Sequence, residues 1–155
     1  MAVEIERKFL VQPGLWTPRT AGDHIRQGYI LSSPERTVRV RIRDGRGYLT
    51  IKGPTTGCSR LEFEYPIPVT DAHELLDQLC PAVVDKHRYL EPLGAHTWEV
   101  DVFHGANDGL VIAEVELQSE QDVLELPVWV GPEVTADFRY GNAYLSHHPF
   151  STWNL

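Results

Sequence analysis

This chain opens with a strand-like stretch, Val3-Glu4-Ile5-Glu6-Arg7-Lys8-Phe9-Leu10-Val11, that alternates charged with apolar residues. In a strand, successive side chains point to opposite faces, so Glu4, Glu6 and Lys8 would share one face. One such strand is ordinary solvent-exposed surface. The same period-two spacing recurs at five further places, which are Arg39/Arg41/Arg43, Glu62/Glu64, Lys86/Arg88, Glu99/Asp101 and Glu114/Glu116. Because one small protein repeats the pattern so often, we expect these strands to share a single charged face.

The length and composition fit one globular domain spanning residues 1–155. A chain of 155 residues can bury a sizeable core, and a composition of 42% hydrophobic and 23% charged residues is typical of a folded protein. The formal net charge of −8 disfavours nucleic acid as a partner. Cys58 and Cys80 lie far apart and in no metal-ligand spacing, so we expect neither a disulfide framework nor a zinc site.

The sequence also predicts where the protein resides. No apolar run approaches the length needed to cross a membrane. The charged strand begins close to the N-terminus and leaves no room for a signal peptide. We therefore expect a soluble, cytoplasmic protein with no membrane partner.

The clearest local structure is a β-hairpin over residues 37–52. Two alternating runs flank Asp44-Gly45, and such a dipeptide strongly favours a two-residue hairpin turn. The resulting register pairs Arg43 with Arg46, Arg41 with Tyr48, Arg39 with Thr50, and Thr37 with Lys52. This register puts the charged and polar side chains on one face and the aliphatic side chains, such as Val40 and Leu49, on the other.

A second hairpin is predicted over residues 85–103, with its turn at Pro92-Leu93-Gly94-Ala95. Pairing across that turn gives two cation–carboxylate pairs, Lys86–Asp101 and Arg88–Glu99. A further strand over residues 110–118 would carry Glu114 and Glu116 on one face, with a register that the sequence leaves open.

Helices are few, and loops such as residues 53–59 connect the strands. We predict three helices. The first spans residues 72–79, is capped by Thr70 or Asp71, and has an apolar stripe of Leu75, Leu76 and Leu79. The second spans residues 119–126 and opens with a capping box at residues 119–122, and the third spans residues 135–147. About eight locally connected strands predict a β-rich α+β fold. We expect a closed, eight-stranded antiparallel barrel with a few helices packed outside.

A charged inner face would limit what such a barrel can hold. Two carboxylates at this spacing lie roughly 7 Å apart along a strand and repel by about 2 kcal/mol at an effective dielectric near 20. Inside a barrel this is tolerable only if bases interleave with the acids or if divalent cations bind. Carboxylates suit Mg²⁺ or Mn²⁺, whereas arginine and lysine bind phosphate oxygens. The residues therefore predict a chamber for a polyphosphate–metal complex and for metal-assisted phosphoryl chemistry.

These motifs resemble a known family. Glu4-Ile5-Glu6-Arg7-Lys8 is similar to the ExExK signature of the CYTH proteins, also called triphosphate tunnel metalloenzymes. Later blocks follow in the family's order, at residues 38–41, 49–52, 61–65, 86–89, 98–103 and 113–117. The chain resembles the short bacterial branch, whose members hydrolyse inorganic triphosphate. The resemblance implies an eight-stranded tunnel with its charged face inward.

The resemblance also implies a role for each matched residue. Metal ligands, for one or two Mg²⁺ or Mn²⁺ ions, would be Glu4, Glu6 and Glu116, helped by Asp101 and Glu114. Triphosphate ligands would be Lys8, Arg39, Arg41, Lys52 and Arg88, with Lys86 close by in a binding or catalytic role. Catalytic roles would fall to Glu62 and Glu64, which position a second metal or the attacking water, and to Tyr29, which matches a position proposed as a proton acceptor.

The chain departs from the family in one block, Phe138-Arg139-Tyr140-Gly141-Asn142. The family usually carries a lysine after the tyrosine, where this chain has Gly141, and that lysine normally contributes to the phosphate site. We therefore expect a weaker grip on the substrate, or compensation by Arg139.

Three functions are compatible with these residues. The leading hypothesis is metal-dependent hydrolysis of inorganic triphosphate (tripolyphosphate) to pyrophosphate and phosphate, by a monomer or homodimer. An alternative keeps the tunnel but changes the substrate, giving a thiamine triphosphatase, a nucleoside triphosphatase or an adenylyl cyclase. A third hypothesis is a noncatalytic module that binds polyphosphate or nucleotides.

Overall fold

A computed structural model describes residues 3–153 of the chain, which are dominated by antiparallel strands. The elements, in chain order, are β1 (Val3–Val11), β2 (Asp23–Ser32), β3 (Thr37–Arg43), β4 (Arg46–Lys52), β5 (Ser59–Ile67), α1 (Val69–Leu79), β6 (Val83–Leu93), β7 (His96–Phe103), η1 (Gly105–Asn107), β8 (Val111–Glu116), β9 (Val130–Glu133), η2 (Phe138–Tyr140), α2 (Asn142–His147) and η3 (Phe150–Thr152). No helix within the described range is both long and apolar enough to span a membrane.

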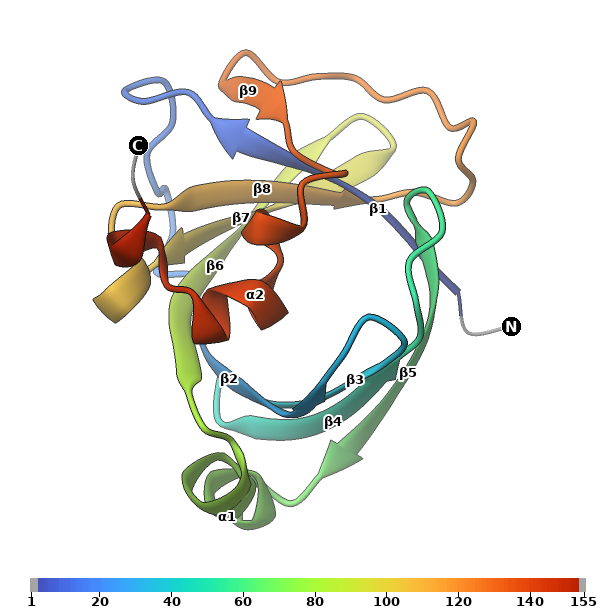
Figure 1. Ribbon diagram of the computed structural model, residues 1–155. Helices are drawn as coiled ribbons and strands as arrows, with labels where there is room; N and C mark the ends of the chain where they lie inside the picture. Colours follow the sequence, from blue (N-terminus) through green and yellow to red (C-terminus); the bar gives the residue numbers. More distant parts are fainter. Residues whose placement is uncertain (1–2, 154–155) are drawn as a thin grey trace.

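Strands β1 to β8 close into an antiparallel barrel, which confirms the predicted fold class (Figure 1). The order around the ring is β5-β4-β3-β2-β6-β7-β8-β1. The ring closes where the start of β1 pairs with the start of β5, from Val3 opposite Leu61 to Ile5 opposite Ser59. The additional short strand, β9, pairs with the other end of β1, at Phe9 and Val11.

The hairpin of β3 and β4 has the predicted register, with Arg43 opposite Arg46 and Thr37 opposite Lys52. Asp44 and Gly45 form the turn, and their φ angles of 50° and 76° are both left-handed. A type I′ turn requires this conformation at both central positions, and its twist matches that of the flanking strands. The turn chemistry and the alternating pattern therefore fix which residues of these strands face inward.

The hairpin of β6 and β7 corrects the predicted register by two residues. Its turn is the dipeptide Gly94-Ala95, so that Arg88 lies opposite Asp101 and Lys86 lies opposite Phe103. Gly94 supplies the left-handed residue, with φ of 60°, and pairing therefore continues through Pro92 to the turn. An even shift leaves every side chain on its predicted face, and long side chains still reach their predicted partners diagonally.

Helix α1 is confirmed, but its buried face differs from the predicted stripe. Ala72 and Leu76 are buried against the outer face of the hairpin of β3 and β4, whereas Leu79 is 55% exposed. The helix starts at Val69 after Pro68, and no side chain caps its first turn. The spacing of four residues between Ala72 and Leu76 aligns them on one face, and Leu79 falls outside it.

The two remaining helix predictions need correction. Residues 119–126 form a turn and an extended segment, because the Asp122 carboxylate accepts a hydrogen bond from the backbone amide of Gln118 at 3.0 Å and binds His96 at 3.4 Å. Residues 135–147 divide into η2 and α2, because Gly141 between them is extended, with ψ of 143°. Side-chain contacts of Asp122 in the first segment and the extended Gly141 in the second accompany the loss of a continuous helix.

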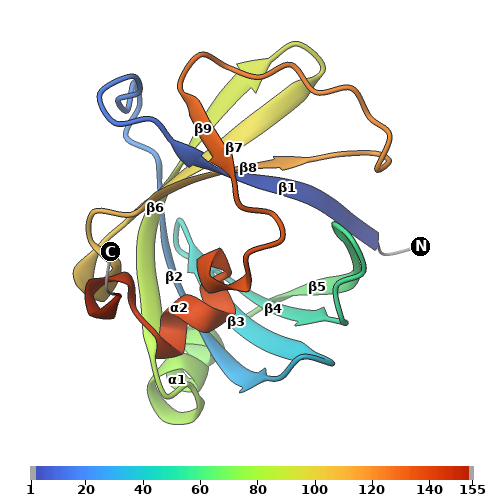
Figure 2. The same ribbon diagram turned by 45° about the horizontal axis from the view of Figure 1, so that its top comes forward.

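Apolar packing lies mainly on the outward faces of the strands. Phe9, Trp98 and Val115 form one cluster that Trp129 and Val130 cover. At one end of the barrel, Leu145 of α2 packs with Val84 and Phe103, and both views show α2 within the outline of the ring (Figures 1 and 2). Val84 and Phe103 lie directly opposite Gln27 and Lys86 and so share their inward faces, which means that α2 closes an apolar end of the interior and that polar side chains line the remainder.

Leu76→Ala should destabilise the protein by about 2–5 kcal/mol, because it removes a side chain buried between α1 and the barrel. The matched change Leu79→Ala should alter the free energy of unfolding by less than about 0.5 kcal/mol, because Leu79 is largely exposed. Urea unfolding of the two variants and the wild type measures both changes. Equal losses at the two positions would contradict the observed orientation of α1.

Candidate active site

The inner face of the barrel gathers most of the predicted site residues around one small cavity. The cavity is lined by Glu6, Lys8, Tyr29, Thr37, Arg39, Arg41, Lys52, Arg60, Arg88, Glu114 and residues 141–143. These residues come from β1 to β6, β8 and the start of α2. Period-two alternation explains the convergence, because each strand contributes every second side chain to the interior.

A buried ion network forms one wall of this interior. Lys86 Nζ donates to Asp101 Oδ2 at 2.7 Å, and Arg88 donates to both Asp101 oxygens at 2.7 and 2.9 Å. Although burial opposes ionisation of Asp101, Arg88 and Lys86 hold the pKa of its carboxyl well below its usual range. Burial lowers the pKa of Lys86 to about 7, against the opposing effect of Asp101. Both Asp101 oxygens are thus committed to cations, which argues for a positioning role rather than direct metal ligation.

The opposite situation holds for Arg41. Its Nε donates to the neutral Gln27 Oε1 at 2.7 Å, and within residues 3–153 it makes no ion pair with a carboxylate. Burial lowers the pKa of Arg41 to about 9, with further contributions from Arg39 and Arg88. Arg39 is nearly as uncompensated, because its ion pair with Glu64 is long, at 3.5 Å. These two guanidinium groups therefore provide the excess positive charge that an anion would neutralise.

Carboxylates accumulate where β1 meets β8. Glu6 lies directly opposite Glu116, and Lys8 lies opposite Glu114. Burial, followed by repulsion from Glu114, raises the pKa of Glu6 to about 7. Burial and then the charge of Glu4 raise the pKa of Glu116. A divalent cation would relieve this repulsion.

Two of the predicted metal ligands, Glu4 and Glu114, are held by cations of the protein. Lys52 Nζ lies 3.0 Å from Glu4 and 3.1 Å from Glu62. Burial and a hydrogen bond with Glu62 nevertheless raise the pKa of Glu4, whereas Lys52 helps to lower the pKa of Glu62 in spite of burial. Glu114 lies 3.8 Å from Lys8 and 3.7 Å from Arg88, and these cations outweigh burial and lower its pKa to about 2.

The donor chemistry fits a hard divalent ion such as Mg²⁺ or Mn²⁺, because the unneutralised groups are carboxylates. In the part of the chain that the structure describes, no three acidic, histidine or cysteine side chains already converge as a coordination shell. Glu6 and Glu116, with Glu4 nearby, are the groups with the strongest electrostatic reason to bind one.

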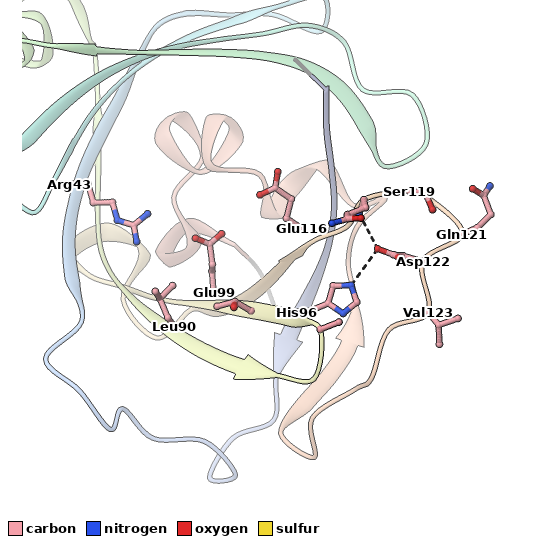
Figure 3. Close-up of a pocket in the computed structure, with 12 residues that line it drawn as sticks. Arg43, Leu90, His96, Glu99, Glu116, Ser119, Gln121, Asp122 and Val123 are labelled. Carbon is pink, nitrogen blue, oxygen red and sulfur yellow. Dashed lines mark hydrogen bonds and ion pairs between the residues drawn. The ribbon is translucent and has the colours of Figure 1, made fainter. Parts of the chain in front are cut away.

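The interior opens at both ends of β3. On the side of Arg43, the opening is lined by Glu99, Glu116, His96 and Asp122, with Glu99 and Glu116 lying between Arg43 and the 118–123 segment (Figure 3). On the side of Thr37, a wider groove is lined by residues of the 53–60 and 135–148 segments and reaches Glu4, Glu6 and Lys8. Among residues 3–153, only the second of these openings, the groove on the side of Thr37, shares lining residues with the central cavity, including Glu6, Lys8 and Thr37.

Arg139 does not compensate for the missing lysine, which corrects the prediction. Its guanidinium binds Asp137 at 2.7 Å and lies over the rings of Tyr140 and Trp153, away from the cavity. Gly141 itself lines the cavity.

The two remaining predicted catalytic residues differ in exposure. Glu64 lies at the rim and is 41% exposed, whereas Tyr29 is buried within the cavity wall.

The predicted site residues did not include four polar residues of this interior, which are Gln27, Thr37, Arg60 and Asn142. Gln27 shares a strand face with Tyr29, so period-two spacing was the available signal. Arg60 likewise continues the face of Glu62, and it binds Glu4 at 3.4 Å. Asn142 accepts a hydrogen bond from Lys86 Nζ at 2.9 Å, a contact that no local pattern reveals.

A closed barrel with cations and carboxylates along its inner face defines a charged tunnel as the class of fold. The chain belongs to the CYTH domain family, whose model matches residues 2–142. It is 47% identical over 154 residues to an inorganic triphosphatase of Acetivibrio thermocellus, with 99% of each chain covered. It is 37% identical to an inorganic triphosphatase of Nitrosomonas europaea, covering 92% of this chain and 96% of that protein. The solved structure of the inorganic triphosphatase NE1496 is similar at a TM-score of 0.66 and 34% identity, covering 94% and 95% of the two chains.

We expect Glu6 to lower the stability of the metal-free protein as the pH rises from about 5 to 7. The unfolded glutamate titrates near 4.5, whereas in the folded chain its pKa is raised to about 7, so the folded state holds an extra proton between these values. This contribution is fully present below the unfolded pKa and is lost as the pH rises through the folded pKa. Between about pH 5 and 7 this loss lowers the free energy of unfolding by an amount on the order of 2 kcal/mol, and Glu6→Gln should remove that decrease.

Urea unfolding in EDTA at several pH values tests this expectation. Other groups titrate in both proteins, so the difference between the variant and the wild type isolates Glu6. Glu35→Gln, at an exposed position in the loop after β2, is the control and should keep the wild-type dependence. Parallel curves for Glu6→Gln and the wild type would show that Glu6 ionises normally.

Proposed function

We propose that this protein is a metal-dependent triphosphatase that hydrolyses inorganic triphosphate to pyrophosphate and phosphate inside the barrel. The observation that carries the proposal is the juxtaposition, in one cavity, of undercompensated arginines with a carboxylate whose pKa is raised. A polyphosphate–metal complex supplies both missing charges at once. The inorganic triphosphatases that are 47% and 37% identical to this chain support this choice of substrate.

The cations would bind and orient the polyanion. Arg39 and Arg41 are the best candidates for one phosphoryl group, because they have the least carboxylate compensation. Lys8, Lys52 and Arg88 line the same cavity and would bind the remaining phosphate oxygens. Planar guanidinium groups suit this task because each can donate two parallel hydrogen bonds.

The carboxylates would hold the metal. We assign this role to Glu6 and Glu116, with Glu4 and Glu114 in support and Asp101 acting through Arg88 and Lys86. Bound Mg²⁺ or Mn²⁺ neutralises charge on phosphate oxygens and lowers the pKa of bound water. Lys86 is fully buried against Asp101 and Asn142, so we assign it a positioning role.

In the reaction, a water oxygen attacks the terminal phosphorus and the bond from that phosphorus to the bridging oxygen breaks. Phosphate and pyrophosphate are the products, and the attacking water loses a proton. Glu62 and Glu64 would orient the water, and Tyr29, whose side chain lines the cavity, would accept the proton in its phenolate form. Burial of these side chains strengthens the charge interactions among them.

Release of orthophosphate from tripolyphosphate tests the proposed function. We expect turnover with added Mg²⁺ or Mn²⁺ and its loss on adding EDTA. Comparison of kcat/KM for tripolyphosphate, thiamine triphosphate and ATP separates the inorganic substrate from the organic ones. Metal-dependent binding of tripolyphosphate in a calorimeter without phosphate release would favour a noncatalytic module, and no turnover with any divalent ion would refute the triphosphatase.

Arg41→Ala should lower kcat/KM about 100-fold, or about 3 kcal/mol, because it removes a preorganised charge from the phosphoryl group. Arg36→Ala is the matched control, because Arg36 is exposed in the loop between β2 and β3. Steady-state kinetics with tripolyphosphate measures both. Wild-type kcat/KM in Arg41→Ala would remove this side chain from the substrate site.

A further inference from the structure

Gln27 is the buried neutral partner of Arg41. It lies on β2 directly opposite Arg41 of β3, and its side chain is completely buried. Its Oε1 accepts the hydrogen bond from Arg41 Nε at 2.7 Å. That bond fixes one edge of the guanidinium group and leaves the terminal nitrogens for other partners.

Three other buried cations of the interior are held closely by carboxylates. Arg88 binds Asp101 at 2.7 Å, Lys86 binds Asp101 at 2.7 Å, and Lys52 binds Glu4 at 3.0 Å. At the position next to Arg41, the chain instead carries an amide of nearly the same shape as glutamate. Whether residue 27 is an amide or a carboxylate therefore decides whether the positive charge of Arg41 is neutralised within the protein.

Several buried polar atoms near Arg41 have no hydrogen-bond partner in the part of the chain that the structure describes. Gln27 Nε2 and Arg39 Nε are buried and have no hydrogen-bond partner within the described residues, and the same is true of Thr37 Oγ1. Thr37, Arg39 and Arg41 all line the cavity. A buried donor left unpaired is unfavourable, so the donors of Thr37, Arg39 and Arg41 that border the cavity favour a ligand with acceptor oxygens.

We propose that Gln27 is a positioning residue that orients the Arg41 guanidinium without neutralising it, which reserves that charge for a phosphoryl group of the substrate. The identity of the anion rests on the proposed function. The role of Gln27 itself follows from the hydrogen bond, the burial and the absence of a carboxylate partner for Arg41 within residues 3–153. The uncompensated charge lowers the stability of the ligand-free protein and raises its affinity for the anion.

Gln27→Glu separates this role from simple packing, because it keeps the shape and the acceptor but adds a charge. The variant should unfold at a higher temperature than the wild type without ligand, because it compensates Arg41. It should bind tripolyphosphate at least 10-fold more weakly in EDTA, and lose kcat/KM mainly through a higher KM. A residue with a merely structural role would not raise stability while lowering affinity.

Two further variants complete the experiment. Gln27→Met keeps the volume but removes the acceptor, and it should lower both thermal stability and kcat, because Arg41 Nε loses its partner. Gln78→Glu adds the same charge at an exposed position of α1 and should leave the affinity for tripolyphosphate unchanged. Differential scanning calorimetry and titration calorimetry measure the two properties independently of turnover.

The outcomes distinguish this proposal from the proposed function. If Gln27→Glu is no more stable than the wild type, or binds tripolyphosphate equally well, the role assigned to Gln27 is wrong. If the wild type binds tripolyphosphate but releases no phosphate, the triphosphatase fails while the affinity comparison still decides on Gln27. If the wild type does not bind tripolyphosphate at all, the phosphate assignment fails together with the function.

Discussion

Compensation of buried charge is the constraint on which this structure depends. Strand alternation directs cations and carboxylates into the same interior, where an ion without a partner would be strongly destabilising. Most of these groups meet that requirement within the protein, as Asp101 does between Lys86 and Arg88. The residual imbalance is local, with excess positive charge at Arg39 and Arg41 and excess negative charge at Glu6 and Glu116.

The scaffold keeps this imbalance in place through apolar contacts on the outside of the barrel. Packing around Trp98 and Val115 supports the strands that carry Asp101 and Glu114, and α1 supports those that carry Arg39 and Arg41. At one end, α2 joins both systems, because Leu145 packs with Phe103 while Asn142 accepts a hydrogen bond from Lys86. The barrel is thus a rigid container whose polar lining cannot relax by moving outward.

The sequence predicts the fold well because period-two alternation is a local property of each strand. It predicted the inner faces of the β6–β7 hairpin even though the register was two residues off, because an even shift preserves facing. Turn chemistry fixed the register only where Asp44-Gly45 gave an unambiguous signal. The helix predicted at residues 119–126 failed because Asp122 is bound by Gln118 and His96, and the latter contact joins distant segments.

The sequence predicted which charged residues line the candidate site, but not which cation binds which carboxylate. The motifs gave the residues that line the interior, whereas only the structure shows that Asp101 is fully committed and that Arg41 is not. Arg139 was misplaced because sequence adjacency to Gly141 does not imply the same orientation, and its side chain binds Asp137 instead. Neutral residues such as Gln27 escape a search for charges, although their effect depends on being neutral.

Closure of the ring by the very first strand has a consequence for biosynthesis. Strand β1 pairs with β8, which spans Val111–Glu116. During synthesis β1 therefore leaves the ribosome about 100 residues before β8 is available for pairing. At about 5–20 residues per second, this wait lasts roughly 5–20 s. Until then Glu6 and Lys8 lie on a part of β1 that has no β8 partner, and charged side chains on an open strand edge oppose its association with other chains. Two of the charges that line the finished tunnel thus also mark the edge of β1 that waits for β8.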